Sequence, residues 1–89
     1  MKITFDPNKD ATNQRKHGVS LVEVEFFEWE TSIVSVDMRH DYGEDRFIAF
    51  GYLHNCIYCV VFTDRDNDER RIISLRKANK REVKRHVET

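Results

Sequence analysis

The feature that most constrains the fold of this chain is a pair of strand-like runs that only two residues separate. Phe47–Leu53 and Cys56–Thr63 are rich in aromatic and β-branched residues, which favour strands. The intervening His54–Asn55 suits a tight hairpin turn, because asparagine tolerates a positive φ. Further runs at Ile33–Asp37 and Arg70–Leu75 predict two more strands. The sequence therefore predicts an antiparallel β-meander of about four strands.

A polar helix is expected before the meander. Asp6 can accept an N-cap hydrogen bond and Gly18 favours termination, so we predict a helix over Pro7–His17. This helix has no apolar stripe, and packing alone gives such a helix little stability. Its ends, a partner or a functional site must therefore hold it. Three polar residues at four-residue spacing share one of its faces, namely Lys9, Asn13 and His17.

The next segment carries two conflicting patterns. Ser20 and Glu23 have the spacing of a capping box, which predicts a short helix over Leu21–Glu28. Val22–Phe26 alternates between apolar and acidic residues, as a strand would. We let the cap decide and expect a helix. The glutamates of this region are expected to be solvated or to face a basic partner.

The order of elements predicts the fold class. Asn79 and Glu82 have capping-box spacing and open a C-terminal helix. Two N-terminal helices, a meander of about four strands and this last helix make an α+β fold in one domain, residues 1–89. Helices are expected to cover one face of the sheet, so the other face must meet more chain, a partner or a ligand.

Charge is divided unevenly along the chain. Residues 70–89 hold eight basic side chains against two acidic ones, whereas residues 1–69 hold seven basic against fourteen acidic. Segregated charge of this kind steers polyanions towards the basic part. Four cations continue along one side of the last helix, namely Lys80, Arg81, Lys84 and Arg85. Two interpretations stay open: a solvated helix on an ordinary domain, or a phosphate-binding face.

Several classes of protein are disfavoured. The chain lacks the ~20 consecutive apolar residues of a membrane span and a charged-then-apolar leader, so we expect a cytoplasmic protein with no membrane contact. Cys56 and Cys59 are three residues apart in a predicted strand, so they point to opposite faces and cannot share a metal ion. The acidic turn around Arg39–Asp45 fits either a Mg²⁺ site or an ordinary solvated turn.

Three segments occur in an order that is typical of one family. They are the opening Phe5–Ser20, the central Gly43–Phe47, and Ile72–Ala78 followed by Glu82. Together they resemble the BrnT family, small toxins of type II toxin–antitoxin systems with a RelE-like ribonuclease fold.

This resemblance implies a metal-independent endoribonuclease that arrests translation and needs no cofactor. It also implies a BrnA-type antitoxin, usually in a heterotetramer of two toxins and two antitoxins. The antitoxin carries the DNA-binding domain in that family, so operator DNA would be contacted only through the antitoxin. The second face of the sheet is then expected to lie under an antitoxin segment.

Metal-free RNA cleavage needs a base, an acid and cations around the phosphorane. His17 is the best base or acid that we predict, and the predicted charge stabilisers are Arg46, Arg76 and Lys77. The polar face of the first helix is expected to border the groove that holds Arg76. The predicted RNA-binding residues are Lys9, Asn13, Lys80, Arg81, Lys84 and Arg85. The alternative is a non-enzymatic nucleic-acid- or protein-binding module that uses the basic C-terminal helix.

Overall fold

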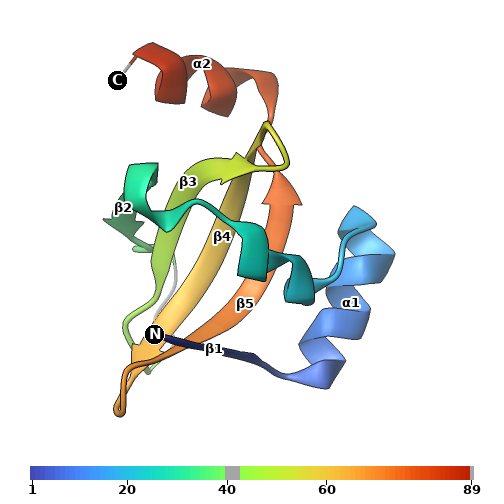
Figure 1. Ribbon diagram of the computed structural model, residues 1–89, viewed down its shortest axis with the longest axis vertical. Helices are drawn as coiled ribbons and strands as arrows, with labels where there is room; N and C mark the ends of the chain where they lie inside the picture. Colours follow the sequence, from blue (N-terminus) through green and yellow to red (C-terminus); the bar gives the residue numbers. More distant parts are fainter. Residues whose placement is uncertain (40–42, 89) are drawn as a thin grey trace.

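The computed structural model describes residues 1–39 and 43–88, which form one mixed sheet with helices around it (Figure 1). Its helical elements are α1 (Pro7–His17), the 3₁₀ helices η1 (Leu21–Phe26) and η2 (Trp29–Thr31), and α2 (Lys80–Glu88). Its strands are β1 (Lys2–Phe5), β2 (Ile33–Val36), β3 (Phe47–Leu53), β4 (Cys56–Arg65) and β5 (Glu69–Lys77). None of the described helices has the length and apolar character that a membrane crossing requires. The predicted α+β class is confirmed, while His40–Tyr42 of the acidic turn lie outside the described residues.

The sheet contains the predicted meander and one strand more. The strand order is β1-β5-β4-β3-β2, and β2 to β5 pair antiparallel. His54 and Asn55 have φ angles of 50° and 68°, which confirms the tight turn between β3 and β4. The expectation of about four strands is wrong by one, because β1 pairs parallel with β5, with Ile3 opposite Arg70. A run of four residues carries too weak a pattern to predict a strand from the sequence when its partner strand is distant in the chain.

The second predicted helix is a 3₁₀ helix rather than an α-helix. The Ser20 side chain accepts a hydrogen bond from the Val22 backbone N–H at 3.2 Å, so Ser20 is the N-cap as predicted. The Glu23 carboxylate, the other half of the predicted capping box, instead lies 3.1 Å from His54 Nε2. A 3₁₀ helix has three residues per turn, which aligns residues three apart on one side. Leu21, Val24 and Phe27 have this spacing and all three are buried. Leu21 and Val24 therefore share the buried side of η1, and Phe27, the C-cap residue with extended backbone, continues this apolar side.

The core lies between this apolar side and one face of the sheet. Leu21, Val24 and Phe27 join a buried cluster with Phe62 of β4 and Leu75 of β5. Figure 1 shows η1 and η2 crossing the strands, α1 beside β5, and α2 beyond the end of the sheet where β5 finishes. The other sheet face is not covered by η1 or η2. The expectation that helical elements cover one face is confirmed.

Candidate functional site

One row of side chains runs across four strands on the sheet face opposite η1 and η2. Ile33 of β2 pairs with Phe50 of β3, Phe50 pairs with Cys59 of β4, and Cys59 pairs with Arg76 of β5. Side chains that are paired directly across neighbouring strands lie on the same face of a sheet. We call this sheet face, defined by Ile33, Phe50, Cys59 and Arg76, the second face. The row ends on β5 with the cationic side chain of Arg76.

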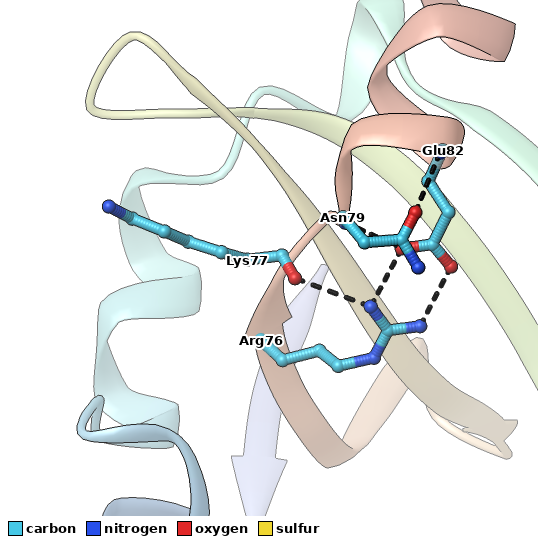
Figure 2. Close-up of polar contacts among 4 residues, drawn as sticks. All are labelled: Arg76, Lys77, Asn79 and Glu82. Carbon is cyan, nitrogen blue, oxygen red and sulfur yellow. Dashed lines mark hydrogen bonds and ion pairs between the residues drawn. The ribbon is translucent and has the colours of Figure 1, made fainter.

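Arg76 is held in a fork by the start of α2. Its two terminal nitrogens donate to Glu82 Oε1 at 2.8 Å and Oε2 at 2.9 Å, and one of them also donates to the Lys77 carbonyl at 3.3 Å (Figure 2). The hydrogen bonds with Arg76 lower the pKa of Glu82 below its usual value. The same bonds raise the pKa of Arg76. The pair therefore stays ionised around neutral pH and fixes the guanidinium at the edge of the second face.

Glu82 takes part in a second structure at the same time. The Asn79 backbone N–H donates to Glu82 Oε1 at 2.9 Å, and the Glu82 backbone N–H donates to Asn79 Oδ1 at 2.8 Å (Figure 2). This reciprocal pair is the predicted capping box of α2 and is confirmed. One carboxylate thus starts the helix and orients Arg76, which ties the position of α2 to the end of β5.

The surroundings of Arg76 combine buried groups, Cys59 and Asp37, with the exposed guanidinium of Arg39. Burial raises the pKa of the Cys59 thiol, so this side chain is a neutral apolar neighbour. Asp37 is a buried carboxylate that accepts two hydrogen bonds from the Arg39 guanidinium, both at 2.9 Å. Both charges of this pair act electrostatically on Cys59. The second face therefore places two guanidinium groups, each aligned by a carboxylate, around an apolar floor.

Lys77 does not share this face with Arg76. Neighbouring residues in a strand point to opposite sides of a sheet. Lys77 pairs with Tyr58, which packs against the core on the other side. Figure 2 shows the Lys77 side chain leading away from the Arg76 guanidinium. The structure therefore does not bring Arg76 and Lys77 together on one face, because the extended backbone directs them to opposite sides of β5.

Arg46 lies at the far end of the sheet from Arg76. β3 and β5 both run antiparallel to β4, so they run in the same direction. Arg46 precedes the first residue of β3, whereas Arg76 is close to the last residue of β5. Its guanidinium forms an ion pair with Glu44 at 3.2 Å. The structure does not bring these two predicted charge stabilisers to one point.

The polar face of α1 lines a groove beside β5. Lys9, Lys16 and His17 border this groove together with Ser74 of β5. Ser74 precedes Arg76 by two residues and so lies on the same side of the strand. Arg76 itself does not line the groove. The α1 groove thus adjoins the second face through Ser74 rather than surrounding Arg76.

Asn13 has a structural position within that helical face. Its side chain is only 3% exposed. Its amide nitrogen donates to the carbonyls of Leu75 at 2.8 Å and Val19 at 2.9 Å, and its oxygen accepts from the Leu75 backbone N–H at 3.0 Å. β1 pairs with β5 only as far as Ile72, so Asn13 takes the place of a neighbouring strand at Leu75. Both amide hydrogens are thus used within the chain, although Asn13 also lines the α1 groove, and its role in RNA binding stays a prediction.

The basic helix α2 keeps its cations at the surface. The four predicted RNA-binding residues on this helix are all exposed, namely Lys80, Arg81, Lys84 and Arg85. Arg81, Lys84 and Arg85 border one shallow groove together with Glu88. Arg85 also lines a small pocket under the helix. The cations of α2 therefore extend outward from the region of Arg76.

Sequence reasoning missed His86, which lies under α2. His86, Glu82 and Arg85 line the small pocket together with Ile33 and Phe50 of the second face. Its ring packs edge-on against Tyr52, with the ring centroids 5.8 Å apart. Its Nδ1 atom is buried and makes no hydrogen bond in the described part of the chain. The four-residue spacing of Glu82 and His86 was the available signal, since it places both on one side of a helix.

A metal centre finds no support in residues 1–39 and 43–88. There, no group of three or more histidine, cysteine, aspartate or glutamate side chains is arranged to hold a metal ion. Cys56 is exposed, Cys59 is buried, and both are free thiols. The geometry thus offers guanidinium, ammonium and imidazole groups, which suit the binding of a phosphate diester.

Comparison with known proteins supplies an independent line of evidence. Residues 5–82 match the model of a family described as the ribonuclease toxin BrnT of type II toxin–antitoxin systems. The chain is also similar to the crystal structure of the ribonuclease toxin BrnT from Brucella abortus, with 30% sequence identity and a TM-score of 0.69. That similarity covers 90% of this chain and 99% of the Brucella chain. No curated protein sequence matches the chain.

Proposed function

The chain belongs to the BrnT family of ribonuclease toxins of type II toxin–antitoxin systems, and on that premise we propose that it cleaves RNA at the second face without a metal ion. The observation that supports this site most directly is the Arg76 fork, because it presents an oriented, half-buried guanidinium at the edge of the second face. Cleavage of messenger RNA by this activity would arrest translation. The proposed setting is the cytoplasm and the proposed fold relationship is to RelE-like ribonucleases.

The proposed reaction uses the 2′-hydroxyl of the RNA as nucleophile. That oxygen forms a bond to phosphorus while the bond to the 5′-oxygen breaks, which yields a 2′,3′-cyclic phosphate and a 5′-hydroxyl. A base takes the proton of the 2′-hydroxyl and an acid protonates the leaving oxygen. Such proton transfers supply roughly 10²–10⁴-fold in rate. Stabilisation of the charge on the phosphorane supplies a further share.

Arg76 is the proposed phosphate contact. A guanidinium has five N–H donors. In the described part of the chain, Arg76 uses three hydrogen bonds, two to Glu82 and one to the Lys77 carbonyl. Two donors remain for a phosphate oxygen. Glu82 acts on the reaction through Arg76, so it is a positioning residue, whereas Lys77 and Arg46 are proposed only as contacts for more distant phosphates.

Two imidazoles flank Arg76 and compete for the proton-transfer roles. His17 lies in the α1 groove, which adjoins the second face at Ser74. His86 lies in the pocket under α2, next to the carboxylate that holds Arg76. Histidine serves such roles because its ordinary pKa is near neutral pH. We propose that one of these two rings is the general base or acid, and single alanine variants of each decide between them.

The remaining cations are proposed to bind phosphates of the RNA on either side of the site. Lys80, Arg81, Lys84 and Arg85 extend along α2, and Lys9 lies in the α1 groove on the other side. Contacts of this kind give affinity without sequence preference. The proposed protein partner is a BrnA-type antitoxin, in an assembly of two toxins and two antitoxins. Operator DNA would be contacted only through that antitoxin.

The test is RNA cleavage by the purified chain in EDTA, with three variants prepared identically. Arg76→Ala removes the proposed phosphate contact, and we expect it to lower the cleavage rate by about 10²-fold or more. Lys77→Ala is the matched control, because it removes a neighbouring cation on the other side of β5. Glu82→Gln leaves the guanidinium in place but weakens its alignment, so an intermediate loss is expected.

The pattern of products separates the proposal from its alternative. Discrete fragments with cyclic phosphate ends from the wild type and from Lys77→Ala, but not from Arg76→Ala, support it. RNA binding without fragments would instead favour a non-enzymatic binding module based on α2. Equal losses in Arg76→Ala and Lys77→Ala would contradict the assignment of the site to the second face.

A further inference from the structure

Exposed apolar side chains gather in one part of the molecule. In the described residues, eight large apolar side chains are exposed, and six of them lie between residues 22 and 38. These six are Val22, Phe26, Ile33, Val34, Val36 and Met38. Three belong to β2 and Met38 lies two residues after it; Val34 is 49% exposed and Val36 is 52% exposed. A concentration of this kind marks a contact surface more often than it marks ordinary solvent-facing surface.

The same residues lie on a free edge of the sheet. β2 is the last strand in the order, so β3 pairs with only one of its sides. The Asp37 backbone N–H donates to the Arg46 carbonyl at 2.7 Å, and bonded positions recur at every second residue of an antiparallel pair. By this alternation Ile33 and Ser35 bond to β3. Val34 and Val36 therefore direct both backbone N–H and C=O away from the sheet.

The segment that leads into and forms this edge is acidic, while cations lie at the two ends of the edge: Arg85 beside Ile33, and Arg39 and Arg46 beside Asp37. Residues 18–38 contain four glutamates and one aspartate and no lysine, arginine or histidine. Asp37 is buried and paired with Arg39, while Glu25, Glu28 and Glu30 are exposed. A free strand edge is normally protected by lysine, proline or a bulge. This edge instead combines apolar side chains with nearby carboxylates. These carboxylates favour a partner of positive charge over one of negative charge.

Charge decides which occupant fits. A second copy of the chain that paired β2 with β2 would bring the two sets of carboxylates together, and like charges of this kind disfavour the pair. An extended segment with alternating apolar residues and flanking lysines or arginines would satisfy the free backbone groups and the carboxylates together. We propose that β2 is the docking edge for such a basic, strand-forming segment of the antitoxin. This inference rests on the proposed function only in taking the antitoxin as the partner.

The experiment uses the full chain and its cognate antitoxin, whose affinity is measured for each variant. Val34→Pro removes one outward N–H, and an edge strand accepts proline where its N–H faces solvent. Val36→Asp removes an apolar contact and adds repulsion, and Val87→Asp is its control on the exposed side of α2. Glu28→Lys with Glu30→Lys inverts the charge. We expect each β2 variant and the charge reversal to weaken antitoxin binding at least about tenfold, and Val87→Asp to leave it unchanged.

Two further measurements keep the result interpretable. Circular dichroism and thermal unfolding show whether each variant is folded. Amide hydrogen exchange of the wild-type complex is expected to protect the Val34 and Val36 amides more than those of the free chain. Wild-type affinity of a folded Val34→Pro chain, or no added protection at these amides, would overturn the proposal.

The remaining outcomes separate this inference from the ribonuclease assignment. Free Val34→Pro is expected to cleave RNA at the wild-type rate, because β2 contributes neither Arg76 nor an imidazole. If the wild type cleaves no RNA but the β2 variants still lose the antitoxin, only the proposed function fails. If sedimentation shows a wild-type dimer that Val34→Pro dissociates, the edge belongs to a second copy and the antitoxin proposal is overturned.

Discussion

The Asn13 side chain makes the hydrogen bonds to β5 that a neighbouring strand would otherwise make. Its amide satisfies both the N–H and the C=O of Leu75 where β1 no longer runs beside β5. Spacing along the sequence correctly placed Asn13 on one face of α1 with Lys9 and His17. It gave no indication that the middle of this face would be buried against a strand edge 62 residues away. Hydrogen bonds rather than an apolar stripe therefore attach the polar helix α1: three through Asn13, and two more that the Asp10 carboxylate accepts from Ser20 and Leu21.

We expect Asn13→Ala to destabilise the fold. The substitution leaves the N–H and C=O of Leu75 in a buried position without partners, which costs about 2–4 kcal/mol in the free energy of unfolding. Urea unfolding followed by circular dichroism measures this difference. Gln14→Ala, on the exposed side of the same helix, is expected to change stability by less than about 0.5 kcal/mol. A stable Asn13→Ala chain with weakened RNA binding would show that Asn13 serves RNA binding rather than the stability of the fold.

At the scale of elements, α2 depends on one carboxylate. Glu82 closes the capping box and holds Arg76, and no residue of α2 is buried. The pKa of Glu82 is lowered in the folded chain. A group with a lowered folded pKa contributes stability above its unfolded pKa and loses this contribution as the pH falls through the folded pKa. The attachment of α2 is therefore expected to weaken below about pH 4.3, the ordinary value for glutamate.

Glu82→Gln tests this dependence. At pH 7 the variant is expected to lose about 1 kcal/mol of stability, because the ion pair is partly exposed. Between pH 5 and pH 3 the wild type should then lose more stability than the variant, as measured by urea unfolding across this range. Glu88→Gln, at the exposed end of α2, is the matched control and should follow the wild type. Parallel acid profiles for Glu82→Gln and the wild type would show that Glu82 is not the titrating group.

Local signals predicted elements whose ends are set by local chemistry. α1 and β3 have the predicted bounds, since a proline, a glycine and a two-residue turn define them. β4 extends two residues and β5 one residue beyond their predicted ends in the polar hairpin between them, because pairing continues there, and β5 also continues to Lys77 at its other end. β1 was missed because only its distant partner β5 makes it a strand. In the candidate site, Arg76 was found from its position after a strand, whereas His86 needed the contact between α2 and the second face.

At the scale of the whole molecule, the two signs of charge occupy different places. The acidic segment 18–38 includes the free edge at β2, while cations concentrate on α2 beyond the other end of β5 (Figure 1). A polyanion is attracted to the second region and repelled by the first. In the proposed function, this separation gives one small domain one surface for RNA and another for a basic protein segment. Net charge, which is −1, conceals this division entirely.

The salt dependence of RNA binding measures how many of these cations contact phosphates. Each contact to single-stranded RNA contributes about −0.7 to the slope of log affinity against log salt concentration. Arg81→Ala with Lys84→Ala is therefore expected to make the slope less steep by about 1.4. Titrations of a labelled RNA at several salt concentrations provide this slope, with Arg76→Ala in the background so that no RNA is consumed.

A control variant that removes the same number of cations elsewhere shows whether the salt slope depends on the position of the cations. Lys2→Ala with Arg65→Ala also removes two exposed cations, but at the start of β1 and the end of β4, which lie at the opposite end of the sheet from α2. If RNA lies along α2, this control lowers affinity slightly through net charge and leaves the slope unchanged. Equal slopes for the two double variants would mean that RNA responds to total charge alone. The basic helix would then be a solvated surface and the path of the RNA would have to lie elsewhere on the molecule.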